Sequence, residues 1–175
     1  MKAPAHRMSL AELKDVCRQD FLANRRVPKS VAIVLSLRLA QFARSQPGVP
    51  GRVLYLVVGS FYRFFTEWML GVEIPAGTTI GPGLRLRHAI GVVINPGTVI
   101  GSDVMIRHGV TLGNRRTRHD CPVIEDGVEL GVNAVVIGSV TIGAGARIGA
   151  GAVVTRDVLP GGIAYVSTTV RAPKA

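Results

Sequence analysis

The sequence predicts a mainly β protein: a parallel β-helix of hexapeptide repeats with an N-terminal α-helical region. Aliphatic residues recur at every sixth position from Ile94 to Val154, with one gap at Arg118, and small or β-branched residues follow four positions later. Glycine, at 21 of 175 residues, directly follows many of the aliphatic residues. Neither an amphipathic helix nor an alternating strand produces a period of six. Short strands joined by tight corners do, with three hexads in each coil and coils stacked about 4.8 Å apart.

Residues 1–70 are predicted to form the α-helical region, which is expected to end near Gly71. Apolar residues recur there at helical spacing in three segments, and Ser9 followed by Glu12 is typical of a capping box. The segments are Ser9–Asn24, Val31–Arg44 and Arg52–Leu70, and the QPGVPG stretch at Gln46–Gly51 is expected to end the second.

The third segment is strongly apolar, but it carries Arg63 and Glu67. A membrane span prefers about 20 residues with few charges. We therefore expect a helix that packs against its own domain or a partner subunit. Peripheral membrane contact through its arginine and aromatic residues is the alternative.

The β-helix repeat is interrupted twice. Two extra residues between Leu86 and Ile94 shift its register, and a missing hexad between Leu112 and Ile124 leaves an excursion loop over 113–123. The expected divisions of the chain are the helical region at 1–70, the β-helix at 71–160 and a C-terminal tail at 161–175.

The chain is basic, with a formal net charge of +10, and residues 1–70 hold 11 Lys and Arg against 4 Asp and Glu. This charge indicates nucleic acid, acidic lipid, an acidic glycan or a phosphorylated cosubstrate as partner, or only a solvated basic face. Cys17 and Cys121 have neither disulfide nor zinc-ligand spacing. No apolar run follows the basic start, so we expect no signal peptide and a cytoplasmic location.

Val72–Val154 resembles the serine acetyltransferase branch of the hexapeptide-repeat acyltransferases. Two motifs are most similar to acetyltransferases of exopolysaccharide gene clusters, the colanic acid type: IRHGVTLGNR at Ile106–Arg115 and VELGVNAVVIGSVTIGAGARIGAGAVV at Val128–Val154. The resemblance implies left-handed coils and an O-acetyltransferase that uses acetyl-CoA as cosubstrate, without a metal. It also implies a homotrimer or a larger assembly that binds no nucleic acid.

The resemblance implies that His88 is the general base. As in serine acetyltransferases, it follows the Leu-x of one coil and precedes a two-residue bulge, and it would take the proton of the acceptor hydroxyl. Glu73, fifteen residues upstream, stands where the family has an Asp that orients this base. Spacing alone places His108 one coil after His88 on the same face, either in the acceptor site or by coincidence of the repeat.

In the excursion loop, Arg118 and His119 resemble a pair that holds the acceptor in serine acetyltransferases. The basic residues of the loop could instead bind the phosphates of coenzyme A or an acidic sugar, or be solvated. For the acyl donor, the resemblance implies a wall of small residues along the C-terminal coils and one arginine for the phosphates: Gly113, Gly131, Ala134, Ala152 and Arg156.

Arg87 stands immediately before His88, where serine acetyltransferases have an Asp that meets the ammonium group of serine. An arginine repels a cationic amine and favours an anionic or neutral acceptor. We therefore expect acetyl transfer to a sugar hydroxyl of an exopolysaccharide or its precursor, in the cytoplasm or at the inner face of the membrane. Free L-serine is the second expectation, and a non-catalytic glycan-binding or scaffold β-helix is the third.

Overall fold

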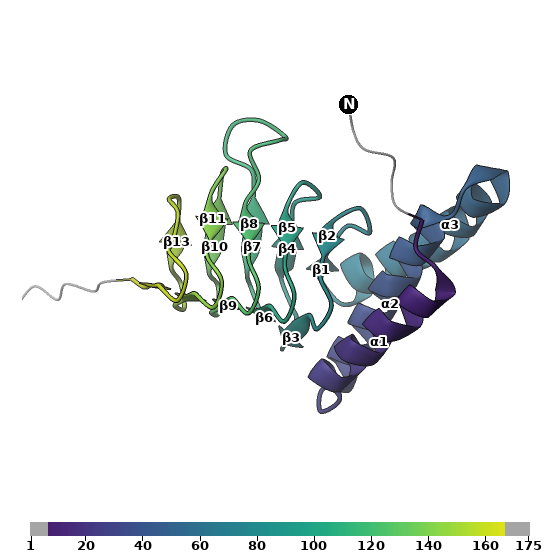
Figure 1. The fold of residues 1–175 in the computed structure, drawn as a ribbon, viewed down its shortest axis with the longest axis horizontal. Coiled ribbons are helices and arrows are strands. Elements are labelled where there is room, and N and C mark those ends of the chain that lie inside the picture. Colours follow the sequence, from purple (N-terminus) through teal and green to yellow (C-terminus); the bar gives the residue numbers. More distant parts are fainter. Residues whose placement is uncertain (1–6, 167–175) are drawn as a thin grey trace, which may run out of the picture.

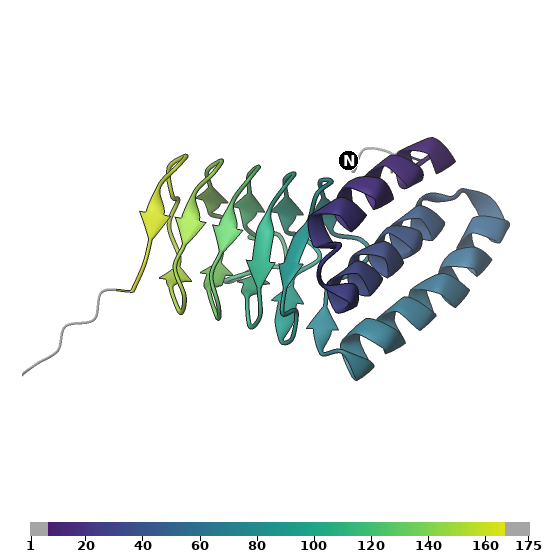
Figure 2. The same cartoon turned by 90° about the horizontal axis from the view of Figure 1, so that it is seen from below.

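The computed structural model describes residues 7–166 of the chain. Three N-terminal helices are followed by a parallel β-helix of about five turns, which confirms the predicted fold class (Figure 1). The helices lie at the first coil, and the coils extend away from them in chain order (Figure 2). Most of the expected C-terminal tail lies outside the described residues.

The helices are α1 (Leu10–Asn24), α2 (Pro28–Ser45) and α3 (Gly48–Arg63), and α3 continues into a π-helical segment, η1 (Phe64–Met69). The capping box is present: the Ser9 hydroxyl accepts from the Glu12 N–H, and the Glu12 carboxylate accepts from the Ser9 N–H. The QPGVPG stretch was expected to lie between two helices, but α3 begins inside it, at Gly48. Pro50 is compatible with the first helical turn because N–H groups there have no intrahelical acceptor.

The coils form three parallel sheets, each built from every third strand. The first sheet contains β1 (Val72–Glu73), β4 (Val92–Ile94), β7 (Thr111–Gly113), β10 (Val135–Ile137) and β13 (Val153–Val154). The second contains β2 (Thr79–Ile80), β5 (Val99–Ile100), β8 (Val123–Ile124) and β11 (Thr141–Ile142). The third contains β3 (Arg85–Arg87), β6 (Met105–Arg107), β9 (Glu129–Leu130), β12 (Arg147–Ile148) and β14 (Ile163–Ala164).

The six-residue anchors fill the interior of the coils. In the third sheet, Leu86, Ile106, Leu130 and Ile148 are in register along the axis, and none is more than 2% exposed. Their strand neighbours point outward, because side chains alternate along a strand. The strand β14 lies beyond residue 160, so the coil continues into the region expected to be tail.

Polar side chains of the helices close the open end of the first coil. Asp20 accepts hydrogen bonds from the N–H groups of Gly83 and Leu84 at 2.8 and 3.1 Å. The guanidinium of Arg38 donates to the carbonyls of Ile80 and Gly81 at 2.9 and 2.6 Å. These backbone groups belong to the first coil, which has no preceding coil to bind them.

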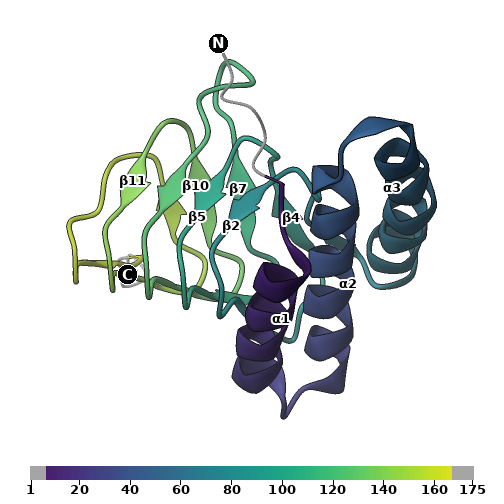
Figure 3. The same ribbon diagram turned by 45° about the vertical axis from the view of Figure 1, so that its right-hand side comes forward.

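Asp20 and Arg38 also form an ion pair at 2.8 Å, with their side chains 0% and 2% exposed. Asn24 continues the closure: its side chain donates to the Leu84 carbonyl and accepts from the Leu86 N–H. Each member of the network therefore has hydrogen-bond partners, which is the condition under which buried charge is tolerated. The view in Figure 3 shows α1 and α2 against the first coil.

The outer side of α3 and η1 is apolar and exposed. Within residues 7–166, every helix is too short or too polar to span a bilayer. Exposed apolar residues on one face are typical of an interaction surface. The larger assembly and the peripheral membrane contact expected from the sequence would both use this face, and both stay predictions. Its exposed residues include Val49, Val53, Leu56, Val57, Phe61, Phe64 and Trp68.

We predict that Asp20→Ala destabilises the protein by about 3–5 kcal/mol, because it leaves the buried Arg38 guanidinium uncompensated. The N–H groups of Gly83 and Leu84 lose their acceptor at the same time. The free energy of unfolding in urea measures the effect, and Asp15→Ala, an exposed change on the same helix, is the matched control. Equal losses in the two variants would contradict this account of the closure.

Candidate active site

His88 lies at the bulge between β3 and β4. It is exposed and has a left-handed backbone with φ of 55°, and Gly91 in the same corner has φ of 65°. This corner holds the two extra residues that shift the repeat. A left-handed conformation costs a non-glycine residue about 1–2 kcal/mol. Asp103 and Asn133 have the same conformation at other corners, so the two-residue bulge, rather than the backbone strain, distinguishes His88.

His108 lies beside His88, one coil further along the axis. The register pairs Leu86 with Ile106 and Arg87 with Arg107, so the two histidines follow their strands at equivalent places. Their ring centroids are 6.4 Å apart and the ring planes meet at 79°, an edge-to-face arrangement. The predicted placement of His108 on the same face, one coil away, is confirmed. Its Nδ1 is buried and has no hydrogen-bond partner among the described residues.

Glu73 is exposed on β1, in the first sheet, and lines a hollow with Arg63 and Glu67. His88 lies in the corner between β3 of the third sheet and β4, the strand that pairs with β1. Within residues 7–166 no hydrogen bond joins the two side chains, so the orienting role of Glu73 stays a prediction.

The excursion loop leaves the first sheet after β7 and enters the second at β8. Asp120 organises its interior, because its carboxylate accepts from the backbone N–H groups of Arg115, Arg116 and Thr117 at 3.2, 2.8 and 3.0 Å. Desolvation raises the pKa of Asp120, but these N–H donors outweigh it and hold the pKa below its usual value. The ionised carboxylate is thus part of the loop structure.

Two further contacts fix the loop to the coil. The Asn95 amide donates to Asn114 at 2.9 Å, and the buried Cys121 thiol contacts the Asn95 oxygen at 3.2 Å. Burial, followed by the charge of Asp120, raises the pKa of Cys121, which keeps it a thiol. Arg118 and His119, the two predicted acceptor residues, lie exposed at the tip of this loop.

Gly113 and Gly131 have different structural reasons for being glycine. A Cβ at Gly131 would come within 2.7 Å of the Ala150 nitrogen in the next coil, so close stacking of the coils requires glycine there. A Cβ at Gly113 would contact only Thr111, at 4.0 Å, and its φ is not positive. Packing of the chain on itself therefore does not explain Gly113. Close approach of a ligand or another subunit to the backbone would explain it.

Ala134 and Ala152 do not line the outer surface, unlike the predicted wall for coenzyme A. Their side chains are 0% and 3% exposed and fill corners of the core. The N–H groups of both residues donate to carbonyls within the coil, and their own carbonyls accept from Thr111 and Val135. We therefore correct their assignment, because neither residue offers coenzyme A an open backbone group.

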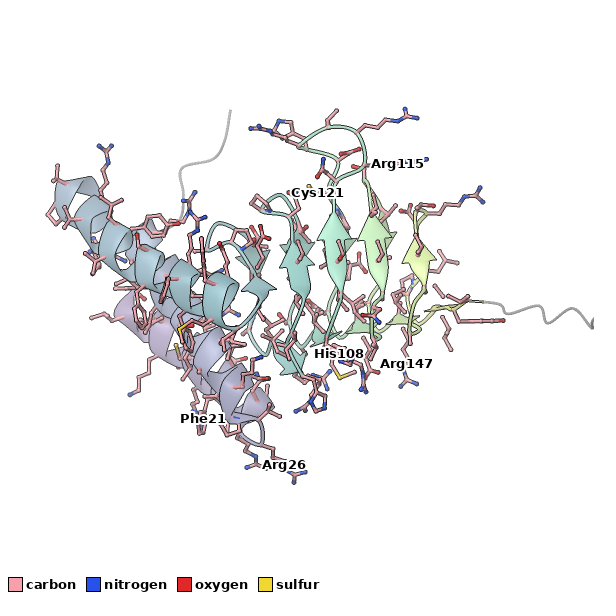
Figure 4. The ribbon with its side chains drawn as sticks, turned by 180° about the vertical axis from the view of Figure 1, so that it is seen from behind. Phe21, Arg26, His108, Arg115, Cys121 and Arg147 are labelled. Carbon is pink, nitrogen blue, oxygen red and sulfur yellow. The ribbon has the colours of Figure 1, made fainter. Side chains whose placement is uncertain are left out.

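The remaining predicted residues form two groups at different edges of the coil. Figure 4 shows His108 and Arg147 at one edge and the loop residues Arg115 and Cys121 at the opposite edge. The first group is on or beside the third sheet and contains Arg87, His88, His108 and Gly131. The second is where the first sheet turns into the second and contains Gly113, Arg118, His119 and the exposed Arg156. One chain does not bring the two groups together.

Comparison with known proteins identifies the family. Residues 121–156 match the family described as bacterial transferase hexapeptide (six repeats). The chain is 37% identical over 143 residues to "Putative colanic acid biosynthesis acetyltransferase WcaB" of Escherichia coli K12, and the match covers 80% of this chain and 88% of that protein. The chain belongs to the hexapeptide-repeat acyltransferases. The protein is an enzyme of the acetyltransferase type, as predicted.

This acyltransferase is also similar to serine acetyltransferases. It is 43% identical over 105 residues to the serine acetyltransferase of Bacillus licheniformis, a match that covers 58% of this chain and 46% of that protein. A serine acetyltransferase solved in complex with CoA has a TM-score of 0.74 at 27% identity, covering 90% of this chain and 68% of that one. These similarities confirm the predicted branch and a family that uses CoA.

Sequence reasoning missed several arginines that lie beside the candidate site. Arg107 has a signal in the repeat, since it follows Ile106 as Arg87 follows Leu86. Arg25 and Arg26 have none, because only the docking of the helices brings the turn after α1 beside Arg87.

We predict that Asp120→Ala loosens the excursion loop and speeds tryptic cleavage after its arginines several-fold, with Asp15→Ala as control. The same effect should appear in the native protein at low pH. A lowered pKa means that the carboxylate contributes order above its ordinary pKa near 3.9, and that this order is lost as pH falls through the lower folded value. An acid-stable protease can test that range, and an unchanged cleavage rate of the variant at neutral pH would exclude the organising role of Asp120.

Proposed function

We propose that the protein transfers the acetyl group of acetyl-CoA to a sugar hydroxyl of an exopolysaccharide or its precursor, with His88 as general base. The observation that carries the proposal is the position of His88 at the bulge, edge-on to His108 and directly after Arg87. An imidazole exchanges protons near neutral pH, and this one is exposed and can reach a substrate.

In the proposed reaction, the His88 imidazole takes the proton of the acceptor hydroxyl while the oxygen attacks the thioester carbonyl carbon. The tetrahedral intermediate then collapses, the bond from carbon to sulfur breaks, and the thiolate of coenzyme A takes the proton back from the imidazolium. The products are the O-acetyl ester and coenzyme A. His108, whose ring centroid lies 6.4 Å from that of His88, is a candidate to contact the acceptor beside the reacting hydroxyl.

A sugar is favoured over serine because of Arg87. The guanidinium repels the ammonium group of an amino acid, whereas it can hydrogen-bond to hydroxyl or anionic groups of a glycan. The extended similarity to WcaB, whose name refers to colanic acid biosynthesis, points to the same acceptor class. Serine O-acetyltransferase activity is the second candidate, favoured by the similarity to serine acetyltransferases.

We infer that the complete site forms between two subunits of a homotrimer. The two groups of predicted residues lie at different edges of one chain, and only a neighbouring subunit could bring a second loop to the first His88. In that arrangement Gly113 and Arg156 would lie along the bound coenzyme A, and Arg118 and His119 would hold the acceptor. The small residue Gly113 lets the pantetheine arm approach the backbone.

The test is thiol release from acetyl-CoA with L-serine, neutral oligosaccharides and acidic oligosaccharides as separate acceptors. We expect turnover with a saccharide and little with serine. Rapid turnover with serine would refute a sugar as the acceptor. Absence of coenzyme A binding would favour a non-catalytic glycan-binding or scaffold β-helix.

We predict that His88→Gly lowers turnover about 10²- to 10⁴-fold, the usual contribution of general acid–base catalysis. The free energy of unfolding should stay equal or rise by about 1 kcal/mol, because glycine adopts the left-handed conformation without strain. Asp103→Gly, at another left-handed residue with φ of 56°, is the control and should leave turnover intact. Full activity of His88→Gly would refute the mechanism.

We also predict that two inactive variants complement each other. His88→Gly subunits, unfolded and refolded with an equal amount of Arg118→Ala/His119→Ala subunits, should regain about one quarter of the wild-type activity. After random mixing in a symmetric ring, about one quarter of the sites between subunits combine an intact His88 with an intact loop. Each variant refolded alone provides the baseline. Activity no higher than the mean of the two baselines would place the site within one subunit.

A further inference from the structure

Four arginines gather at the edge of the molecule that carries His88. Arg25 and Arg26, in the turn after α1, line a hollow of about 160 Å³ together with Arg87. Arg107 stands opposite Arg87 in the register of β3 and β6. Arg87 and Arg107 face outward, because the residues before them in their strands, Leu86 and Ile106, face the core and side chains alternate along a strand.

Among the described residues, 7–166, the side chains of these four arginines have no hydrogen-bond or ion-pair partner. Glu129 lines a separate hollow with Arg107, and its carboxylate lies 3.8 Å from the Arg147 guanidinium. Like charges on directly opposite strand positions are destabilising, so the pairing of Arg87 with Arg107 opposes stability unless an anion is bound.

The cluster is placed to hold a substrate that His88 acts on. Arg87 directly precedes His88 and Arg107 directly precedes His108, so a row of arginines runs beside the pair of histidines on adjacent strands. Arg26 and His108 lie at the same lower edge of the molecule (Figure 4). A sugar whose hydroxyl meets His88 could therefore place a charged substituent over the arginines.

We propose that the acceptor is an anionic saccharide, whose carboxylate or phosphate binds to Arg25, Arg26, Arg87 and Arg107 while its hydroxyl faces His88. The inference rests on the proposed acetyl transfer to a sugar. Guanidinium groups present paired N–H donors that match both carboxylate and phosphate oxygens. The hollow has room for such a group and bound water, with Leu22 and Ala23 as its apolar lining.

The phosphates of coenzyme A are the other anions that this enzyme family meets. Of the residues predicted for coenzyme A, Gly131, at the arginine edge, is already required by coil stacking, and Gly113 and Arg156 lie at the other edge of the coil. In a shared site, a donor held there by one subunit would present its thioester to the His88 edge of the next. The cluster then remains free for the acceptor.

Binding measured by calorimetry tests the proposal without need of turnover. The probes are a uronate-containing oligosaccharide and its carboxyl-reduced form, and glucose 1-phosphate and glucose. In each pair of saccharides that binds, we expect the anionic member to bind at least about tenfold more tightly than the neutral one. This difference in affinity should decrease as salt is added. A preference confined to the uronate or to the phosphate would identify which anion the acceptor carries. Equal affinity within both pairs would overturn the proposal.

Arg25→Gln/Arg26→Gln should reduce the anionic preference on the order of tenfold, since two partly screened charge-assisted contacts are lost. Arg18→Gln, exposed on α1 and outside the hollow, is the matched control and should change the anionic preference little. The affinity for coenzyme A should be the same in all three proteins. Weaker coenzyme A binding in the double variant would assign the cluster to the donor and overturn the proposal.

His88→Gly separates this proposal from the proposed reaction. The variant should still prefer the anionic saccharide in calorimetry, because the arginines and the fold are retained. If the wild-type protein binds anionic saccharides through Arg25 and Arg26 but acetylates none, the reaction is wrong and the binding site stands. If it acetylates a neutral saccharide as readily as an anionic one, the reaction stands and the arginine site is wrong.

Discussion

The closure of the first coil by Asp20 and Arg38 is the constraint on which the rest of the structure depends. Every inner coil binds its backbone groups to coils on both sides, but the first coil has only one neighbour. The buried ion pair and Asn24 supply the missing partners for the backbone of residues 80–86. Because these contacts fix α1 against β3, they also fix the turn with Arg25 and Arg26 beside Arg87. The contacts that stabilise the first coil thereby also position the arginines on one side of the candidate site.

The repeat carried most of what could be predicted. Each inward anchor must lie over the anchor of the previous coil, so a residue's place around the coil follows from counting along the sequence. This is why the pairing of His88 with His108 could be predicted without a structure, and why a two-residue shift marked His88 as exceptional. The same counting would have placed Arg107 beside Arg87, since both follow anchors by one residue.

Features that depend on tertiary contacts could not be predicted in this way. The family resemblance named Ala134 and Ala152 for coenzyme A, but a small side chain is equally suited to an inner corner, and there the structure has them. Gly131 and Gly113 look alike in sequence, yet only Gly131 is required by coil stacking. The buried roles of Asp20 and Arg38 were also missed, because nothing in an isolated helix shows which charges a neighbouring β-helix will bury.

A packed coil has no room inside for a substrate, since aliphatic anchors fill its interior. Ligands must therefore bind outside, where a flat sheet covers little of their surface, although binding sites are usually concave. Concavity beside the coil arises where other segments project from it, as at the turn after α1 beside the third sheet and at the Asp120-organised loop. These two lie at different edges of the same chain. A trimer would place the loop of one subunit opposite the arginines and His88 of the next, so that recognition of the acceptor and activation of its hydroxyl would both depend on assembly.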